Sequence, residues 1–391
     1  MSGSGRAPGW ALGSGGPVVC VIGAGAVGLC CALELARRGS EVSLLDARHV
    51  AAGSSGLSVG IVETQYLERL DIELRVRAME TFGWLEREHG LRVVRNGYLR
   101  LGHDSSSCVA FERSVEIQRE LGVEDAEVLD RGAVARLVPE MRTDDVRAGL
   151  FGRNDGFVDG HLYCGLLAEL AVASGVRLLL ATELRGAESL AGGGLRLETS
   201  GSELECDLAV DAAGAWAGRV AALLGCELSL SPQRHQACVV HLPHELGYAM
   251  PSVMDYTPGS GKRGLYFRHE GPGRLIAGLH GEEASALGAD PGSYSRGVDS
   301  EFLEELARRL SSRLPALADA TLAGGWAGLY PVSTTGRPIV GPALGGVPVI
   351  VAGGAGGSGI QLSPAIGELV ADWVLHGEPR ALPAARRLAP G

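Results

Sequence analysis

Apolar stretches alternate with amphipathic ones along the chain, and this alternation predicts a mixed α/β protein. The apolar run Val18–Ile22 predicts a buried strand, and the mostly apolar residues 26–38, which end at Gly39, predict a helix. Residues 41–46 predict the next strand. The start of the chain therefore forms a strand–helix–strand unit.

Later segments show both helical and strand periodicity. Helical spacing of apolar residues predicts helices at 64–90, 110–121, near 133, and at 161–174, 301–310 and 363–375. Strands punctuated by Gly and Pro are expected at 237–242, 252–256, 264–269 and 274–279. Such a run of short strands indicates an antiparallel sheet.

The composition is that of a globular protein with two domains. The chain has 391 residues, of which 46% are hydrophobic, and a formal net charge of −11. The negative charge argues against a nucleic-acid or anionic-membrane partner, because either would require a concentrated positive face. Positive charge is almost all arginine, since Lys262 is the sole lysine.

Cysteine spacing and glycine content bear on compartment and membrane insertion. The eight cysteines include no CxxC pair, which predicts reduced thiols, a cytoplasmic protein and no structural metal site. Glycines interrupt the apolar stretches 17–36 and 347–366, so neither is expected to span a membrane. Residues 1–16 are rich in Gly and Ser and are expected to form a disordered arm without an export signal.

A glycine loop follows the first strand directly. Its sequence is GAGAVG, from Gly23 to Gly28, and Asp46 ends the next strand. Glycine allows backbone N–H groups to approach a pyrophosphate, the helix N-terminus favours negative charge, and an acid can accept from ribose hydroxyls. The expected contacts are Gly23, Gly25, Ala26, Val27, Gly28 and Asp46. The alternative is that the glycines only allow close helix–sheet packing. Asp46 disfavours NADP, and FAD and NAD both remain open at this point.

A second glycine-rich loop lies near the C-terminus, between an apolar strand and a helix expected to begin at Ser363–Pro364. The N-terminal dipole of that helix would stabilise the negative charge of a reduced flavin ring, which favours FAD over NAD. The expected contacts are Gly354, Gly356, Gly357, Ser358, Gly359, Ile360 and Gln361. The alternative is a tightly packed glycine loop with no ligand.

Several separated motifs together resemble the D-amino acid oxidase-like family of FAD-dependent oxidoreductases, within its sarcosine oxidase, glycine oxidase and sarcosine dehydrogenase branch. Besides the two loops, they are GSSG at 53–56, DAAGAWA at 211–217, YFR at 266–268, WAGLYP at 326–331, GRPIVG at 336–341 and SPAIG at 363–367. The resemblance implies further FAD contacts from Ser54, Ser55, Gly214 and Trp216.

The resemblance also implies a fold and a reaction. The fold is a Rossmann-type FAD-binding domain interleaved with an α+β substrate domain built on an antiparallel sheet. We assign residues 17–90, 151–230 and 322–391 to the FAD-binding domain and residues 91–150 and 231–321 to the substrate domain. The family oxidises amines α to a carboxylate, and the expected reaction is hydride transfer from an amino acid-like small molecule to flavin N5.

Departures from the family pattern affect the cofactor and the electron acceptor. Leu57 stands where some members attach FAD through histidine, and no cysteine follows Cys238, so FAD is expected to be non-covalent. Ile276 stands where monomeric sarcosine oxidases place a lysine that assists dioxygen. The acceptor is therefore dioxygen or a redox partner, with a dehydrogenase favoured.

Substrate-binding residues are harder to assign, because the positions of the family's carboxylate clamp hold Tyr330, Gly357 and Gln361. In a strand over 264–269, Tyr266 and Arg268 project from one face, and the Arg268 fork suits a carboxylate. The alternative is a surface arginine. Tyr266 and Tyr330 are candidates for lining the flavin or for packing in the core, and residues 63–66 are a further candidate for the pocket.

Two other functions remain compatible with the same motifs. One is an FAD-dependent 2-hydroxy acid dehydrogenase, which would need a base for the alcohol proton. The other is a flavin subunit of an electron-transfer complex without turnover of its own.

Overall fold

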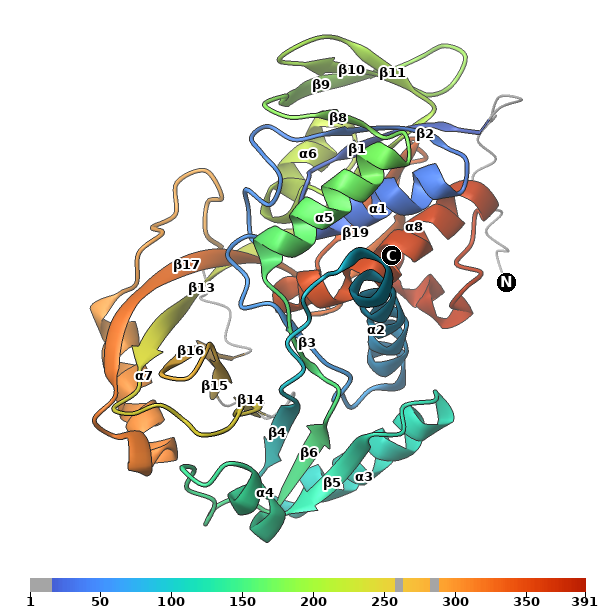
Figure 1. The fold of residues 1–391 in the computed structure, drawn as a ribbon. Helices are drawn as coiled ribbons and strands as arrows, with labels where there is room; N and C mark the ends of the chain where they lie inside the picture. The colour runs from blue at the N-terminus through green and yellow to red at the C-terminus, as the bar shows by residue number, and fades with distance from the viewer. Residues whose placement is uncertain (1–15, 257–262, 282–287) are drawn as a thin grey trace. The chain divides into compact units, whose positions relative to one another are not determined.

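The predicted strand–helix–strand unit forms the centre of a six-stranded sheet. The computed structural model describes residues 16–256, 263–281 and 288–391 (Figure 1). The sheet order is β18-β19-β12-β1-β2-β8. Its strands are β1 (Val18–Ile22), β2 (Glu41–Leu45), β8 (Arg177–Leu179), β12 (Leu208–Asp211), β18 (Ile339–Pro342) and β19 (Val349–Gly353). Every neighbouring pair is parallel except β18 with β19. This is the parallel core that the first motif predicts.

Helices and a small sheet cover the two faces of this parallel sheet. Helix α1 (Ala26–Arg37) packs against α5 (Gly160–Ala173) and α8 (Gly359–His376) on one face. Helix α6 (Ala217–Leu223) and the antiparallel sheet of β9 (Leu184–Ser189), β10 (Leu195–Thr199) and β11 (Leu204–Cys206) share an apolar core with the other face. Helices α1 and α8 approach closely at Gly367, where a Cβ atom would lie 2.8 Å from the Cys30 carbonyl.

Helix α8 begins four residues earlier than the sequence predicts, at Gly359 instead of Ser363. Pro364 therefore lies inside the helix, where it has no N–H to donate to the Ile360 carbonyl. The Ser363 hydroxyl donates to that carbonyl instead, at 2.7 Å, and contacts the Tyr163 hydroxyl at 2.9 Å. Because a side-chain hydroxyl takes the place of the missing backbone N–H, the helix tolerates proline here.

A second sheet, of eight strands, carries the antiparallel run predicted from the middle of the chain. Its order is β17-β13-β16-β15-β14-β4-β6-β5. The strands are β4 (Tyr98–Gly102), β5 (Ala126–Asp130), β6 (Ala148–Gly152), β13 (Leu230–His241), β14 (Ser252–Asp255), β15 (Gly264–His269), β16 (Arg274–His280) and β17 (Thr321–Ser333). Strands β14 and β4 pair in parallel, whereas β13, β16, β15 and β14 pair in antiparallel fashion, as do β4, β6 and β5.

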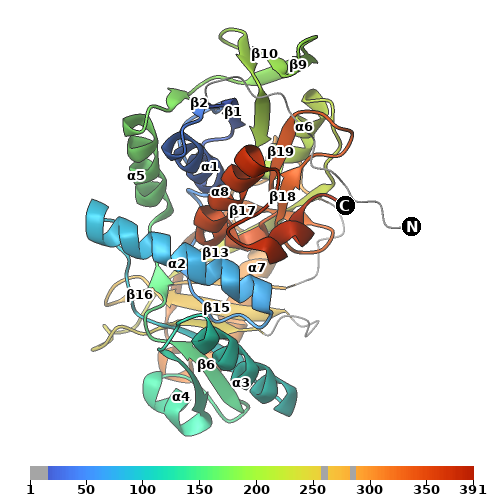
Figure 2. The same cartoon turned by 90° about the vertical axis from the view of Figure 1, so that its right-hand side faces the viewer.

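The two faces of the eight-stranded sheet differ in chemistry. One face packs its aliphatic residues against α7 (Ser300–Arg313) and α4 (Arg131–Leu137). The pairing register places polar and aromatic residues on the opposite face, namely Tyr98, Arg100, Tyr266 and Arg268, together with Met254. Helix α3 (Ser105–Glu120) covers β5 and β6, and α2 (Arg69–His89) contacts α3 (Figure 2). Below, the face with Arg100 is called the polar face.

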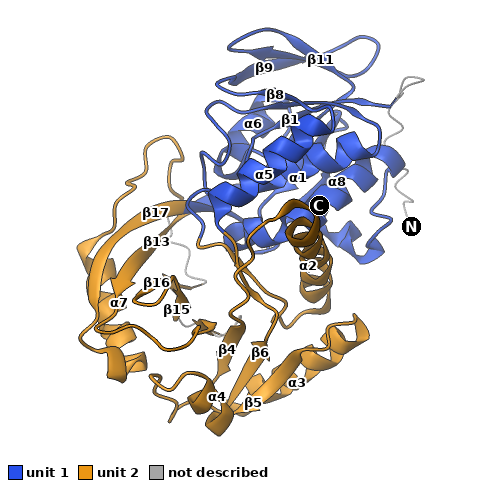
Figure 3. Ribbon diagram, in the orientation of Figure 1, with its two compact units in different colours: residues 1–58, 159–232, 329–391 blue, residues 59–158, 233–328 orange. Residues whose placement is uncertain are grey.

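The described chain divides into two compact units, shown in Figure 3. Unit 1 contains the described residues up to 58 with 159–232 and 329–391, and unit 2 contains 59–158 and the described part of 233–328. Residues 59–90, 151–158 and 322–328 were assigned above to the FAD-binding domain, but they cluster with unit 2, whereas residues 231 and 232 belong to unit 1. The reason is long-range pairing, because β3 (Ile61–Val62) pairs with β7 (Gly156–Phe157) and Val94 bridges Phe157.

The expected disordered arm falls outside the described residues, apart from residue 16. The sole lysine, Lys262, also lies outside them.

Candidate cofactor-binding and substrate-binding sites

The first glycine loop brings β1 and α1 close together in unit 1. Gly23 has φ +109°, and a Cβ atom there would lie 2.6 Å from the Ala212 carbonyl oxygen. A Cβ atom at Gly28 would overlap the Gly23 carbonyl oxygen. At both positions, backbone atoms of the protein itself leave no room for a side chain. Close packing therefore accounts for part of the glycine pattern, as the alternative interpretation holds.

The N-terminus of α1 and the acid after β2 face the same loop. Asp46 accepts hydrogen bonds from the Ala24 N–H and the Arg48 N–H, both at 2.8 Å. A carboxylate has about four lone-pair sites, so these two bonds orient Asp46 and leave capacity for hydroxyl donors. The loop thus offers amides at a helix N-terminus beside a fixed acceptor.

The segment that contains Ser54 and Ser55 contacts the glycine loop. The Ser55 hydroxyl accepts from the Ala26 N–H at 3.0 Å and so caps the first turn of α1. Ser54 donates to the Leu329 carbonyl at 2.5 Å. The structure therefore brings Ser55 to the predicted phosphate loop, but it shows the Ala26 amide already bonded to protein.

Trp216 lies beside the same region of unit 1. It ends the 3₁₀ turn Gly214–Trp216, and the Arg48 guanidinium lies 5.1 Å from its ring centroid. A Cβ atom at Gly53 would lie 3.6 Å from the Trp216 ring. Segments near residues 23, 50 and 215 therefore converge, as expected for one binding site.

The C-terminal glycine loop forms a 3₁₀ turn, Gly356–Ser358, that leads into α8. The Tyr330 ring lies against Gly357, where a Cβ atom would be 2.5 Å from a ring carbon. Burial raises the pKa of Tyr330 to about 12, so the phenol stays protonated at neutral pH. Ile360 and Gln361 are buried in the first turn of α8, while the exposed edge of the loop is Gly357.

Gly359 differs from most glycines of unit 1. Its φ of −59° suits any residue, and a Cβ atom there would meet no atom within 4 Å. Neither backbone conformation nor protein packing therefore requires glycine at this position. Open space beside the N-terminus of a long helix fits a flat, electron-rich ligand.

Tyr266 and Arg268 lie on the polar face of unit 2, as their spacing predicts. The Tyr266 ring crosses the neighbouring strand at Gly278, where a Cβ atom would overlap the phenol. Arg268 is buried, forms an ion pair with Glu270 and lies 3.9 Å from the Phe157 ring centroid. Arg268 is therefore not a surface arginine, but its charge already has a partner.

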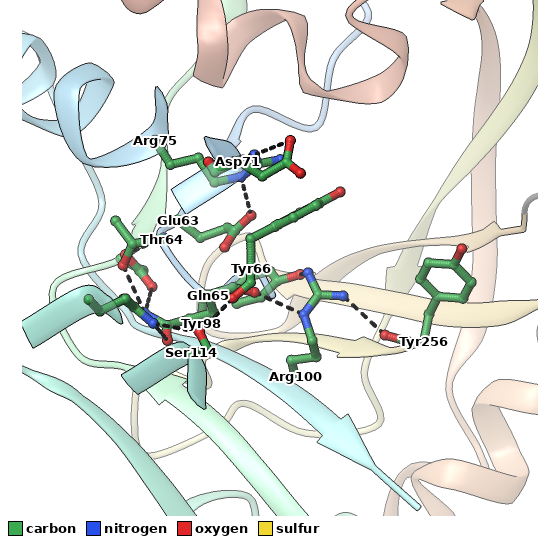
Figure 4. Close-up of polar contacts among 12 residues, drawn as sticks. Glu63, Thr64, Gln65, Tyr66, Asp71, Arg75, Tyr98, Arg100, Ser114 and Tyr256 are labelled. Atoms are coloured by element: carbon green, nitrogen blue, oxygen red, sulfur yellow. Dashed lines mark hydrogen bonds and ion pairs between the residues drawn. The ribbon is translucent and has the colours of Figure 1, made fainter. Parts of the chain in front are cut away.

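A buried polar network fills the part of unit 2 that contains residues 63–66 (Figure 4). Arg75 of α2 donates to Glu63 at 3.2 Å and to the Asp71 carbonyl at 3.0 Å, and its guanidinium carbon lies 3.5 Å from the Tyr66 ring centroid. Arg100 of β4 lies on the same ring, at 5.1 Å. Two buried cations thus contact one half-buried tyrosine.

A second branch of this network is built on Asp155. It accepts from the Thr64 N–H at 3.1 Å and from the Gln65 side chain at 2.9 Å, and Gln65 also exchanges hydrogen bonds with Gln118. Burial, followed by the nearby Glu63, raises the pKa of Asp155. This branch fixes Thr64 and Gln65, the two residues that precede Tyr66.

Sequence reasoning missed Arg75, Arg100 and Asp155. One signal for Arg100 was present, because Tyr98 and Arg100 alternate with Leu99 and Leu101 in a strand pattern. The alternation places Arg100 on a polar face but does not show what lies next to it. Arg75 and Asp155 carry no comparable local signal.

Side-chain clusters and helix hydropathy bear on metal binding and membrane insertion. In the part of the chain that the structure describes, no group of three or more His, Cys, Asp or Glu side chains could hold a metal ion. None of the described helices is long and apolar enough to cross a membrane. All eight cysteines are free thiols.

Comparison with protein families gives a match to FAD dependent oxidoreductase over residues 19–373. The chain belongs to this family. Its fold is therefore the FAD-binding fold that the motifs predict, and FAD is its cofactor.

Individual relatives are similar over nearly their whole length. The glycine oxidase of Geobacillus kaustophilus (strain HTA426) is 26% identical over 365 residues, covering 91% of this chain and 92% of the relative. The crystal structure of L-proline dehydrogenase from P. horikoshii has a TM-score of 0.83 at 26% identity and covers 95% of this chain and 96% of its own. That of iminodiacetate oxidase from Chelativorans sp. BNC1 has a TM-score of 0.73 at 27% identity, covering 95% and 98%.

The residues of unit 1 fit the cofactor of this FAD-dependent oxidoreductase. Two backbone amides orient the Asp46 carboxylate, which can accept further hydrogen bonds. The space beside Gly359, at the N-terminus of α8, is not filled by other described residues. The two glycine loops would hold FAD, and its ring system, when bound, supplies the capacity to accept two electrons.

Proposed function

We propose that this FAD-dependent oxidoreductase oxidises a C–N bond of an amino acid in which a secondary amine lies α to a carboxylate. The observation that carries the proposal is the near full-length similarity to glycine oxidase, L-proline dehydrogenase and iminodiacetate oxidase. All three substrates named for those proteins carry nitrogen on a carbon next to a carboxylate, and two of the three are secondary amines.

The polar face of unit 2 supports this assignment chemically. Tyr266 supplies a phenol for hydrogen bonding, and arginine side chains on the same face suit a carboxylate. Oxidation of a neutral amine requires the substrate C–H bond to be positioned, and it does not require a strong general base. Tyrosine and arginine side chains on this face are therefore sufficient to bind and position the substrate.

The 2-hydroxy acid alternative is less well supported. It would require a base for the alcohol proton, and the polar face offers the histidine pair His235 and His280, whose ring centroids lie 6.3 Å apart. Burial, with His280 and Arg263 nearby, lowers the pKa of His235 to about 3. A histidine with so low a pKa is a poor proton acceptor at neutral pH.

FAD is proposed to be held without a covalent bond. We expect acid or heat denaturation to release all of the flavin into the supernatant and to leave a polypeptide of unmodified mass. The reason is that leucine at position 57 and the absence of any cysteine after Cys238 leave no attachment residue at the positions that the family uses. Mass spectrometry of the denatured protein checks this, and a flavin adduct on the polypeptide would contradict it.

The reaction itself is tested by anaerobic reduction of the bound flavin. L-Proline, sarcosine and iminodiacetate are expected to bleach the flavin absorbance, glycine to do so more slowly, and lactate and 2-hydroxyglutarate to have no effect. Bleaching by 2-hydroxy acids alone would replace the proposal with the alcohol chemistry. Failure of every compound would instead favour a flavin subunit of a larger complex.

We propose that the acceptor is a redox partner and that the enzyme acts as a dehydrogenase in the cytoplasm. The family resemblance puts Ile276 at the position of the lysine of monomeric sarcosine oxidases, and Ile276 is uncharged. Without a lysine ammonium at this position, a developing superoxide anion has less electrostatic stabilisation. Oxygen consumption measured with an active substrate distinguishes the two, and uptake as fast as dye reduction would contradict a dehydrogenase.

A further inference from the structure

Four arginines of unit 2 are buried among the described residues, and three of them have carboxylate partners. Arg75 pairs with Glu63, Arg268 with Glu270, and Arg313 with both Asp145 and Asp255. The fourth, Arg100, is 2% exposed and forms no ion pair within the described part of the chain. A buried cation is costly unless an anion accompanies it, which makes Arg100 the exception to explain.

The immediate partners of Arg100 are all neutral. Its Nε donates to the Gln65 carbonyl at 2.9 Å, and its two terminal nitrogens donate to the Tyr256 carbonyl at 3.1 Å and to the Tyr98 hydroxyl at 3.3 Å. The Tyr66 and Tyr98 rings lie 5.1 and 5.7 Å from the guanidinium carbon. Figure 4 shows the guanidinium between Tyr66 and Tyr256.

Glu63 is the carboxylate whose charge acts on Arg100, but it already forms an ion pair with Arg75. One of its oxygens accepts from Arg75 at 3.2 Å, and it contributes to the potential at Arg100 only through space. The Tyr98 phenol remains protonated, because burial raises its pKa. One buried carboxylate thus serves two buried arginines, and among the described residues neither Glu63 nor Tyr98 forms an ion pair with Arg100.

We propose that Arg100 binds the carboxylate of the amino acid substrate. This inference rests on the proposed function and names the residue that recognises the acid group. A guanidinium has five N–H donors, of which three are used here, so two remain for an incoming anion. The three neutral bonds hold the fork in one orientation, and such preorganisation strengthens binding of a bidentate anion.

The surroundings of Arg100 also indicate how it is reached. Gln65, Tyr98 and Tyr256 are buried, whereas Tyr66 is half-buried. Of these four residues, Tyr66 is thus the one that meets solvent. A carboxylate bound there would exchange water for charge-assisted hydrogen bonds in a low-dielectric setting, where such bonds are strongest.

Arg100 replaces Arg268 as the leading candidate for this role. Glu270 neutralises Arg268, and a second carboxylate at that position would meet repulsion from the first. Both arginines stand on the same face of the sheet, so a sequence pattern could not separate them. Their ion-pair partners distinguish them, because Arg268 has Glu270 and Arg100 has no described carboxylate in contact.

The test compares a substrate acid with its uncharged amide in purified holoenzyme. Ligand-induced thermal shifts and flavin reduction are measured with L-proline and L-prolinamide for wild type, Arg100→Gln, Arg100→Lys, Arg268→Gln and the exposed-surface control Arg113→Gln. Wild type and Arg113→Gln are expected to prefer the acid by at least about 100-fold, the factor typical of a site built around a charged hydrogen bond. Arg100→Gln is expected to lose that preference, and Arg100→Lys to restore part of it.

Outcomes separate this inference from the proposed function. If amines reduce the flavin but Arg100→Gln keeps the acid preference, or Arg268→Gln alone abolishes it, Arg100 is not the carboxylate-binding residue. If no amine reduces wild-type flavin, the proposed function itself fails. Should Arg100→Gln and Arg100→Lys both fail to fold, equal thermal shifts by L-proline and L-prolinamide in wild type would still overturn the inference, and a shift by the acid alone would support it.

Discussion

Replacement of Gly359 with leucine is expected to abolish retention of FAD while unit 1 remains folded. Gly359 has helical φ and no atom within 4 Å of a Cβ position, and leucine is a better helix former than glycine. The leucine side chain would fill the open space at the start of α8. We expect FAD affinity to fall at least about 100-fold, or about 3 kcal/mol, because the obstruction is steric.

The matched control for this experiment is Gly165→Leu in α5. Gly165 is also helical, half-exposed and free of atoms within 4 Å of a Cβ position. Flavin absorbance per polypeptide after purification and circular dichroism of both variants are the measurements. Normal FAD content in Gly359→Leu would show that the space beside α8 is not where the cofactor binds.

Asp211→Asn is expected to remove a strong pH dependence of stability. Asp211 is fully buried at the end of β12; burial raises its pKa from 3.8 to about 7, and the Ala213 N–H bond to one oxygen offsets only part of this. Its second carboxylate oxygen has no hydrogen-bond partner in the described part of the chain. Because the folded pKa lies above the unfolded one, the folded state binds more protons between about pH 4 and 7, and stability falls as pH rises through that window.

The size of this effect follows from the shift. A shift of about three units corresponds to a loss of about 4 kcal/mol by pH 8, as an upper value. Asparagine keeps an acceptor for the Ala213 N–H and cannot ionise. Chemical denaturation at pH 5 and pH 8 should therefore show a flatter profile for Asp211→Asn and greater stability than wild type at pH 8.

An exposed carboxylate of unit 1 provides the comparison. Glu169 lies on the exposed side of α5, and Glu169→Gln is expected to follow the wild-type pH profile. If Asp211→Asn shows the same pH dependence as wild type, Asp211 is ionised in the folded protein at neutral pH, and its environment is more polar than the contacts indicate.

Local patterns predicted much of unit 1. The apolar strand Val18–Ile22, the GAGAVG loop and Asp46 lie within 30 residues of one another, and backbone conformation and charge at such sites depend on neighbours in sequence. The second glycine loop is similarly local. Its helix start was misplaced by four residues, because the Ser363 hydroxyl supplies the hydrogen bond that Pro364 cannot.

By itself, the sequence determined the cofactor class, the parallel core and the face on which Tyr266 and Arg268 lie. Only the tertiary structure decided which buried charges are neutralised. Glu63 reaches Arg75, Glu270 reaches Arg268, and Arg100 meets the carbonyl of Tyr256, 156 residues away, in place of an anion. Periodicity specifies the direction of a side chain, whereas the folded structure sets which group a buried charge meets. That group lies two residues away for Arg268 and 156 residues away for Arg100.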